Sequence, residues 1–295
     1  MIGDPKQVIT SLVILITLLC MRSASASAAP LLPSQGSTTF QFDDDSAGYA
    51  VDLDVNLDAT GKRFRMVLSQ SADTSESADD SEQNLDSKSY SFGLSSNPAN
   101  PVEFSANYED WGQDDTFSIG TLSGTVRFNS TEWSFGLTPY LRNIDITRTN
   151  PSGRANNVSF DSQGLSVDLG FYGFERFFIH GRYINYNYSE DVSKLDVSSR
   201  PSLFLFFTPA ALSFSQGLED SALSVAVDYS FNPVTVGIEL SQSRSAVDDS
   251  LSNVTSFSLT WPLSHKWGAT TGGGWLNQEN QDEIRFFSGS LHYRW

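Results

Sequence analysis

The feature that most constrains this chain is a period-two alternation of bulky apolar and polar residues. The clearest example is YAVDLDVNLD at 49–58, and ALSVAVDYSF at 222–231, PVTVGIEL at 233–240 and TSFSLTW at 255–261 repeat it. Successive side chains of a β-strand point to opposite faces of its sheet, so each segment predicts a strand with one apolar face. Helical spacing is hard to find anywhere in the chain, and the expected fold class is all-β.

The alternating segments predict about sixteen strands, with fourteen as the alternative, and the strands in question are the first one and the pair 199–207 and 210–217. The expected strands are 37–43, 48–57, 62–71, 87–95, 101–109, 115–128, 132–142, 163–172, 176–188, 199–207, 210–217, 221–231, 234–245, 253–261, 266–276 and 284–295. Short connections rich in Gly, Pro and Asn alternate with connections that are mostly longer and acidic. This order predicts an antiparallel meander with short turns at one end and long loops at the other.

The N-terminus carries the pattern of a secretory signal peptide. The apolar run VITSLVILITLLC at 8–20 is followed by the small-residue stretch SASASAA at 23–29. The run is short for a membrane-spanning helix, and the small residues predict cleavage after Ala28, or after Ala26 in the same pattern. We therefore expect a signal peptide at 1–28, a short lead at 29–36 and one domain at 37–295.

Composition excludes several classes of protein. The chain has 35 Asp and Glu against 18 Lys and Arg, a formal charge of −17, which makes nucleic acid an unfavourable partner. The single cysteine, Cys20, falls in the predicted signal peptide, so no disulfide is expected in the mature chain. Aromatic residues make up 13% of the chain, enough apolar surface to argue against disorder.

The tryptophans sort to the ends of the expected strands. Four lie next to short turns and two next to long loops; in that order they are Trp133, Trp261, Trp267, Trp295, Trp111 and Trp275. Tyrosine and tryptophan favour the water–lipid boundaries of a membrane, so all six are predicted to be interface anchors. A soluble β-sandwich or propeller would show the same alternation, but it gives no reason for this sorting.

Taken together, the signal peptide, the alternating strands, the uneven loops and the final strand resemble Gram-negative outer-membrane β-barrels of the porin-like class. The resemblance implies a transmembrane antiparallel up-and-down barrel in the outer membrane, with periplasmic turns and acidic extracellular loops. It also implies that Leu291, Tyr293 and Trp295 form the C-terminal signal read by the barrel-insertion machinery. The lipid bilayer and lipopolysaccharide are the implied surroundings, and a homotrimer is the implied assembly.

The function implied by the resemblance is a porin-like channel for passive diffusion of small hydrophilic solutes or ions, without catalysis or a cofactor. The polar face of each strand would line the lumen, and its candidates are Asp52, Asp54, Asn56, Arg63, Arg65, Glu103, Arg127, Arg142, Asp168, His180, Arg182, Asp228 and Glu239, with His292 and Arg294 near the end of the chain. We expect cross-strand neighbours in Asp54 with Arg65, Asn56 with Arg63, and Asp168 with His180 or Arg182. These charges are either satisfied ion pairs of a wet wall or the source of a transverse field that orients solutes.

Other functions stay open. A barrel plugged by loop 72–86 or loop 146–162 would be an adhesin or structural protein. A barrel hydrolase is the less favoured alternative, because the chain has no Gly-x-Ser-x-Gly or His-Glu-x-x-His motif. The acidic loops bear Asp43–Asp45, Asp79–Asp80, Asp114–Asp115 and Asp248–Asp249, which predict weak binding of divalent cations and lack the ligand spacing of an EF-hand.

Overall fold

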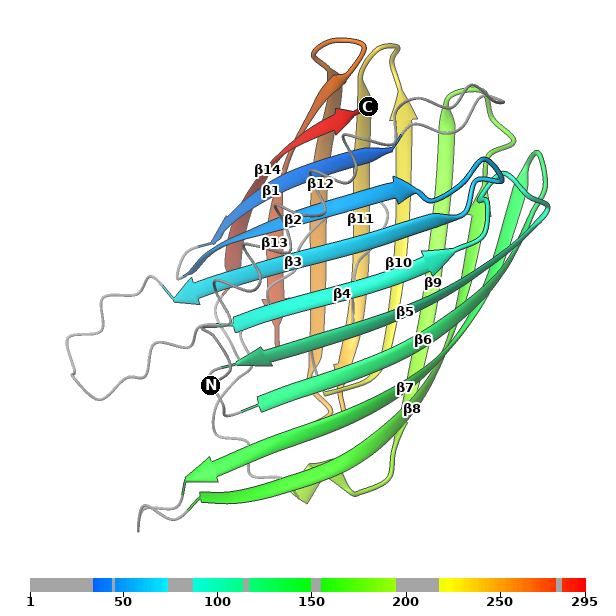
Figure 1. Cartoon of the computed structure of the whole chain (residues 1–295). Helices are drawn as coiled ribbons and strands as arrows, with labels where there is room; N and C mark the ends of the chain where they lie inside the picture. The colour runs from blue at the N-terminus through cyan, green and yellow to red at the C-terminus, as the bar shows by residue number, and fades with distance from the viewer. Residues whose placement is uncertain are drawn as a thin grey trace, which may run out of the picture.

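A computed structural model of the protein describes residues 34–43, 46–73, 87–113, 117–149, 155–194, 218–279 and 283–295. Its fourteen strands form one closed antiparallel barrel, in which each strand pairs with its neighbours in the sequence and β14 pairs with β1 (Figure 1). Closure leaves no strand edge with unpaired backbone groups. The predicted antiparallel up-and-down barrel is therefore confirmed.

The strands differ in length, and β7 and β8 are the longest. They are β1 (Gln35–Asp43), β2 (Ser46–Asn56), β3 (Arg63–Asp73), β4 (Ser87–Ser95), β5 (Val102–Gln113), β6 (Phe117–Asn129), β7 (Trp133–Thr149), β8 (Ala155–Phe171), β9 (Phe177–Tyr188), β10 (Glu219–Ser230), β11 (Thr235–Ser245), β12 (Leu251–Pro262), β13 (Trp267–Gln278) and β14 (Ile284–Arg294). A short 3-10 helix, η1 (Val192–Lys194), follows β9. Within these described elements, no helix is long and apolar enough to cross a membrane.

The ring formed by the described residues has fourteen strands, which is the alternative count and not the sixteen expected from the sequence. Strand β9 pairs directly with β10, so the ring is complete without a further hairpin at this position. The expected strands 199–207 and 210–217 lie outside the described residues, as does the predicted signal peptide 1–28. Strand β1 begins at Gln35, so the last two residues of the predicted lead belong to the barrel.

The two faces of the barrel wall differ in polarity, as β7 illustrates. Phe135 and Leu137 are exposed on the outer face, whereas Ser134 and Thr138 are buried on the inner face. Exposed apolar side chains of this size recur on the outer face of β1, β2, β4–β6 and β8–β14. Such a surface costs about 25 cal/mol per Å² in water, so this exterior is suited to lipid.

Near the long-loop end, the alternation on β7 and β8 reverses. Asn143 and Asp145 now face outward, and Ile144 and Ile146 are buried on the inner face. The outward polar groups bond to one another across the hairpin: Asn143 Nδ2 donates to Asp161 Oδ1 at 3.2 Å, and the Ser159 hydroxyl donates to Asp145. An outward polar face belongs in water, so the wall leaves the apolar layer between Leu141 and Asn143.

This reversal explains why the predicted loop 146–162 is wrong. Most of that range continues β7 and β8 as a long hairpin. The apolar positions change from odd to even numbers beyond Leu141, and the sequence pattern therefore looks interrupted where the strand is in fact continuous. The predicted strands 132–142 and 163–172 stop at this change of phase.

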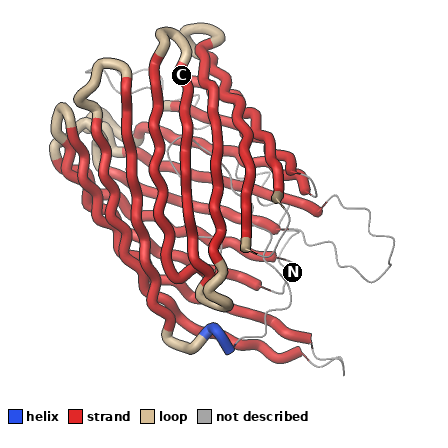
Figure 2. The backbone as a smooth tube through the Cα atoms, turned by 180° about the vertical axis from the view of Figure 1, so that it is seen from behind, coloured by secondary structure: helices blue, strands red, loops and turns tan. Residues whose placement is uncertain are grey.

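The short turns lie at one end of the barrel, where the C-terminus is also found (Figure 2). Backbone hydrogen bonds close several of these turns, for example from Leu57 N to Lys62 O at 2.8 Å and from Phe231 N to Val234 O at 2.6 Å. Trp295 N donates to Ser34 O at 3.0 Å, so both ends of the described barrel meet here. An even number of strands requires this arrangement.

Candidate functional site

The inner face of the barrel carries a row of charged residues that runs across five neighbouring strands. Backbone register links Glu103 on β5, Arg127 on β6, Gly136 on β7, Asp168 on β8 and Arg182 on β9. Arg127 Nη1 lies 3.7 Å from Glu103 Oε2, and Arg182 Nε lies 2.5 Å from Asp168 Oδ1. A Cβ atom at position 136 would lie 3.2 Å from the Asp168 Cβ atom and 3.5 Å from Arg127 Nε, so Gly136 lies directly between these two side chains of the row.

Asp168 contacts three polar side chains and is the central carboxylate of this charged row. Its side chain is only 4% exposed, and its carboxylate accepts Arg182 Nε and lies 3.6 Å from His180 Nε2. The Ser166 hydroxyl donates to the other carboxylate oxygen at 3.5 Å. A buried carboxylate is stable only when it is paired and hydrogen-bonded, and these three side chains supply that environment. The sequence predicted His180 or Arg182 beside Asp168, and both residues lie there.

A second charged group lies on β2 and β3. The register pairs Asp54 with Arg65 and Asn56 with Arg63, as the sequence predicts. The ion pairs instead run diagonally, with Arg65 Nη2 at 2.6 Å from Asp52 Oδ2 and Arg63 Nη2 at 2.8 Å from Asp54 Oδ2. A long arginine side chain reaches the diagonal neighbour, which backbone register alone does not specify.

Two lumen carboxylates differ from the others. Asp228 on β10 and Glu239 on β11 lie on adjacent strands, where their register partners are Gly237 and Ala226. Among the described residues, neither carboxylate has a cationic nitrogen within 4.0 Å. Four acid–arginine ion pairs line the described lumen below the mouth, and Asp228 and Glu239 add two carboxylates that are not part of these pairs.

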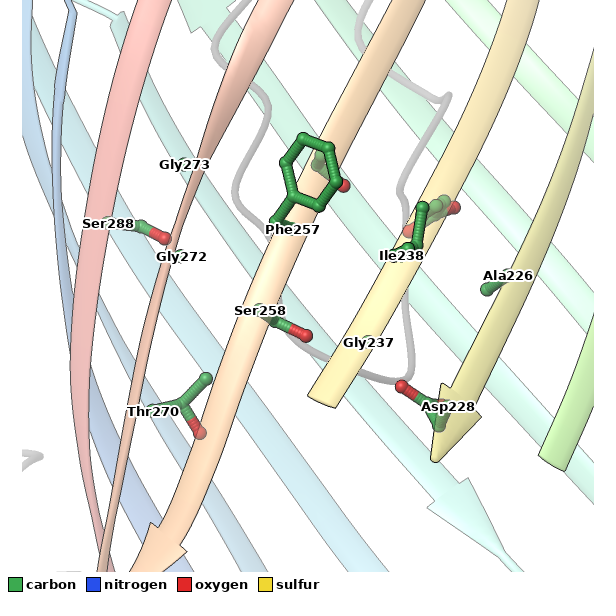
Figure 3. Close-up of a pocket in the computed structure, with 12 residues that line it drawn as sticks. Ala226, Asp228, Gly237, Ile238, Phe257, Ser258, Thr270, Gly272, Gly273 and Ser288 are labelled. Atoms are coloured by element: carbon green, nitrogen blue, oxygen red, sulfur yellow. The ribbon is translucent and has the colours of Figure 1, made fainter. Parts of the chain in front are cut away.

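The two carboxylates border a shallow recess of about 50 Å³ in the wall between β10 and β14. Figure 3 shows Asp228, Gly237, Ser258, Gly272 and Ser288 on successive strands along it. A Cβ atom at position 237 would collide with the Asp228 carboxylate and the Ser258 hydroxyl, so glycine lets both groups reach across β11. This continuous row of small residues was not predicted from the sequence.

The wall from β12 to β1 carries hydroxyl groups in place of charges over most of its height. Its inward residues include Ser256, Ser258, Thr260, Thr270, Ser288, Ser290 and Thr39. Near the short-turn end, His292 Nε2 lies 2.9 Å from both Thr270 Oγ1 and Ser290 Oγ. Arg294 is inward by register and exposed at the rim. One uncharged wall thus faces the charged walls of β2–β11.

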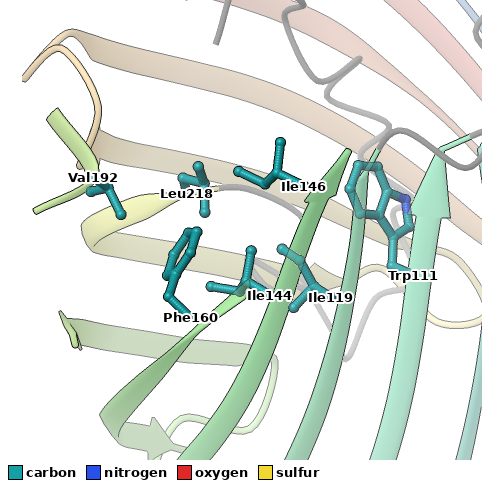
Figure 4. Close-up of a cluster of buried hydrophobic side chains, with 7 residues drawn as sticks. All are labelled: Trp111, Ile119, Ile144, Ile146, Phe160, Val192 and Leu218. Atoms are coloured by element: carbon teal, nitrogen blue, oxygen red, sulfur yellow. The ribbon is translucent and has the colours of Figure 1, made fainter. Parts of the chain in front are cut away.

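At the long-loop end the lumen becomes apolar. One group, called the mouth cluster below, is shown in Figure 4 and consists of Trp111, Ile119, Ile144, Ile146, Phe160, Val192 and Leu218. A second group, the wall cluster, consists of Ile184, Tyr186, Ala222, Val254, Leu276 and Phe286. Tyr188 packs against both clusters. The inner face is therefore polar where the outer face is apolar, and it becomes apolar closer to the long-loop end.

Trp111 is a correction to the predicted interface anchors. It is 2% exposed and packs inside the mouth cluster, with its ring centroid 5.3 Å from that of Phe117. Strand β5 extends to Gln113, and Trp111 is eight residues from Glu103, so both side chains face inward. The other five tryptophans lie on the outer face, and ring contacts such as Trp133 with Phe171 at 4.3 Å reinforce that surface.

Arg142 is also inward, but it belongs to the mouth and not to the membrane part of the lumen. Its guanidinium carbon lies 4.5 Å from the centre of the Tyr186 ring, and the residue is 2% exposed. Glu219, at the start of β10, is 7% exposed and interacts electrostatically with Arg142. The Tyr188 hydroxyl donates to the backbone oxygen of Glu219 at 2.6 Å.

Of the acidic pairs in the loops, only Asp248–Asp249 is fully described. Asp248 Oδ1 accepts the Ser250 hydroxyl at 2.7 Å and the Ser250 amide at 3.2 Å. Hydrogen bonds from Ser245 and Ser250 lower the pKa of Asp248, so its carboxylate already has partners within the turn. In the described ranges, no group of three or more His, Cys, Asp or Glu residues could hold a metal ion.

No family model matches the chain, and no curated protein matches it in sequence. One similar solved structure is the Pseudomonas putida toluene transporter TodX, with a TM-score of 0.50, 8% identity and 90% of each chain covered. Another is a loop-deletion mutant of OmpT, an outer-membrane protein of Vibrio cholerae. It has a TM-score of 0.48 at 11% identity, and the match covers 89% of this chain and 97% of that one. The KdgM porin gives a TM-score of 0.44 at 9% identity and covers 88% of this chain and 99% of that one.

The likeness to TodX concerns the fold, and it agrees with the closed ring and the apolar exterior described above. The chain is a fourteen-stranded antiparallel barrel with the architecture of outer-membrane barrels.

Proposed function

We propose that the protein is an outer-membrane channel through which small hydrophilic solutes or ions diffuse. The observation that carries this proposal is the inverted wall, which is apolar outside and charged inside over the membrane part of the barrel. Lipid requires the first property, and a hydrated lumen requires the second. Transport is also the role named for TodX, the barrel from Pseudomonas putida.

The charge distribution supports a preference for cations. Each arginine of the membrane part lies beside a carboxylate, which cancels much of its field, whereas Asp228 and Glu239 have no arginine nitrogen within 4.0 Å among the described residues. An excess of charge of one sign concentrates ions of the opposite sign in a narrow, low-dielectric passage. We infer that these two carboxylates set the ion selectivity, and that the net charge of the loops does not.

The test is single-channel recording of the refolded protein in planar bilayers, with a salt gradient across the membrane. We expect steady conductance steps and a reversal potential of the sign that indicates cation preference. The double variant Asp228→Asn, Glu239→Gln should move the reversal potential toward zero. The matched control, Asp161→Asn on the outer face of β8, should leave it unchanged. Protein that inserts and stays silent contradicts the channel.

A second candidate function is a barrel with a filled lumen that acts as an adhesin or structural protein. The buried mouth and wall clusters favour it, because they place apolar side chains where a wide pore would be open. Silent insertion in the bilayer experiment would support this function.

The hydrolase alternative finds little support in the geometry. Ser166 donates to Asp168, and no serine hydroxyl is bonded to the His180 imidazole in the described part of the barrel. Ser290 Oγ lies 2.9 Å from His292 Nε2, but Thr270 Oγ1 shares that nitrogen and no described carboxylate lies within 4.0 Å of His292 to orient its ring. An activated serine needs its hydroxyl on the histidine. Lipopolysaccharide, the insertion machinery, a homotrimer and weak divalent-cation binding at the acidic loops stay predictions of the sequence.

A further inference from the structure

The recess in the wall between β10 and β14 is built from polar side chains that alternate with glycines. Backbone register places one row across the five strands, consisting of Asp228, Gly237, Ser258, Gly272 and Ser288 (Figure 3). Each glycine therefore opens a gap between two polar side chains. The Asp228 carboxylate and the Ser258 hydroxyl both reach the point where a Cβ atom of residue 237 would stand, so these two groups converge on the first gap.

The described polar side chains that line the recess offer oxygen atoms and no N–H group. They are Asp228, Glu239, Ser256, Ser258, Thr270 and Ser288. Among the described residues, neither carboxylate has a hydrogen-bond partner or a cationic nitrogen within 4.0 Å. A carboxylate oxygen accepts hydrogen bonds, and a hydroxyl can accept or donate. The recess therefore suits a group that brings several donors and no acceptor.

Two basic side chains of β9 act on these carboxylates. His180 interacts electrostatically with Asp228, and Arg182 interacts with Glu239. Both basic side chains also lie beside Asp168, at 3.6 Å and 2.5 Å, and this carboxylate offsets their field at the recess. Asp228 supplies negative charge, and Glu239 supplies a second acceptor oxygen whether or not it carries a proton. The recess therefore favours a cation over an anion.

The size of the recess limits which part of a solute can enter it. One water-sized group needs about 10–15 Å³, so a recess of about 50 Å³ holds an ammonium nitrogen with the first carbon atoms of its chain. A primary ammonium group has three N–H donors and no acceptor. Its hydrogen bonds to a carboxylate are roughly twice as strong as those of a neutral hydroxyl group.

We propose that this recess binds the primary ammonium group of small amine solutes as they pass through the lumen. The nitrogen occupies the gap at Gly237, donates to Asp228 and Ser258, and has Glu239 as a further acceptor in the same recess. The inference rests on the proposed channel and deepens it, because it names a solute class where the charge distribution favours cations in general. The shape of the gap distinguishes a primary ammonium group from a cation of equal charge that has no N–H donor.

Propylammonium is the probe, because this amine is protonated at about pH 8. It is titrated into the refolded full-length barrel in detergent, and binding is followed by saturation-transfer NMR of the probe. We expect saturable binding that Asp228→Asn weakens about tenfold, because a charge-assisted hydrogen bond is lost.

Gly237→Ala tests the gap itself, because this variant keeps both carboxylates. The atoms that must move are the ends of the Asp228 and Ser258 side chains, so the barrel should still refold. The added Cβ atom occupies the place of the nitrogen and should weaken binding at least about fivefold. The matched control is Gly289→Ala on the outer face of β14, where a Cβ atom meets nothing within 4 Å, and it should bind like the wild type.

Ser258→Ala is a further variant, and it should also weaken binding. Tetramethylammonium, which has the charge without an N–H donor, and the neutral propanol should both bind more weakly than propylammonium. Equal affinity of the wild type and Gly237→Ala, or binding of either comparison probe as tight as that of propylammonium, would overturn the proposal. Cation-selective conductance without saturable propylammonium binding would overturn this inference alone, and propylammonium binding by a silent barrel would overturn the channel alone.

Discussion

Asp168 shows how much a single residue can determine in a charged lumen. Its carboxylate contacts Arg182, His180 and Ser166 while nearly excluded from solvent. Sequence alternation predicted that Asp168 faces inward with Arg182. It did not predict that Arg127 lies in the same row with Gly136 between it and Asp168, because register across an intervening strand is not visible in the alternation pattern.

Replacing Asp168 by asparagine should therefore destabilise the barrel strongly. The change leaves the partly buried Arg182 guanidinium without this carboxylate, and because breaking a fully buried pair costs about 3–5 kcal/mol, we expect a loss near the lower end of that range. Urea unfolding in lipid vesicles measures the difference. Asp161→Asn, an exposed change on the same strand, should shift the free energy of unfolding by less than about 1 kcal/mol. Equal effects of the two substitutions would contradict the role of Asp168 as the central carboxylate of the charged row.

Asp58 gives a prediction of pH dependence in the β2–β3 turn. Its Oδ1 accepts the Thr60 hydroxyl at 2.5 Å and the Thr60 amide at 2.8 Å, which lowers the pKa of Asp58 to about 2. Because the folded pKa lies below the unfolded value, the stabilisation is complete above about pH 4 and is lost as the pH falls toward 2. Melting temperatures of the wild type and Asp58→Asn should converge over that window. A constant difference down to pH 2 would argue against this turn bond.

At the scale of elements, the reversal of polarity on β7 and β8 marks the outer boundary of the membrane. Leu141 is exposed on the outer face and Asn143, two residues later, faces the same way with a polar partner across the hairpin. The same change occurs on β12, from Phe257 to Asn253. Outward apolar residues end where lipid ends, and the inward apolar clusters begin at this level.

This boundary can be tested with single cysteines, because Cys20 of the predicted signal peptide is the chain's only cysteine. In protein reconstituted in vesicles, Asn143→Cys should react with a membrane-impermeant thiol reagent added outside. Leu141→Cys should stay unreactive, because lipid covers it. Denatured samples of both variants should label fully. Equal labelling of the two folded variants would move the boundary away from this position.

The elements also show what the sequence could predict and where it stopped. Alternation located all fourteen strands of the ring, because one apolar face was continuous within the membrane layer. Alternation failed for Trp111 and for the parts of β7 and β8 near the long-loop end. Beyond the membrane the outer face meets water, so the apolar side chains there point into the barrel. A parity count along β5 from Glu103 would have placed Trp111 inside. The mouth cluster could not be predicted, since it joins strands β5–β8 to residues such as Val192 and Leu218 from later connections.

At the scale of the whole molecule, the closing strand links the two ends of the barrel. Trp295 N bonds to Ser34 O, the Trp295 ring stacks with Tyr293 at 5.8 Å, and β14 pairs with β1. Deletion of Trp295 should reduce the amount of heat-modifiable barrel in the outer-membrane fraction at least several-fold. Trp133→Phe keeps the signal intact and should assemble normally. Normal assembly of the deletion variant would remove Trp295 from the predicted insertion signal.

The meeting of the two ends has a consequence for chain connectivity. Every pairing but β1 with β14 joins sequence neighbours, so the ring has one seam, and Trp295 and Ser34 already touch across it. A short peptide could join these ends, and a new start could be opened in the exposed turn at 263–266. Such a circular permutant would keep every strand pair while moving Trp295 to an internal position, after the second strand of the new chain. Refolding of this permutant in vitro would measure what the Trp295 side chain contributes to barrel stability. Its assembly into the outer membrane in cells would measure what the free C-terminal carboxyl group contributes to recognition for insertion.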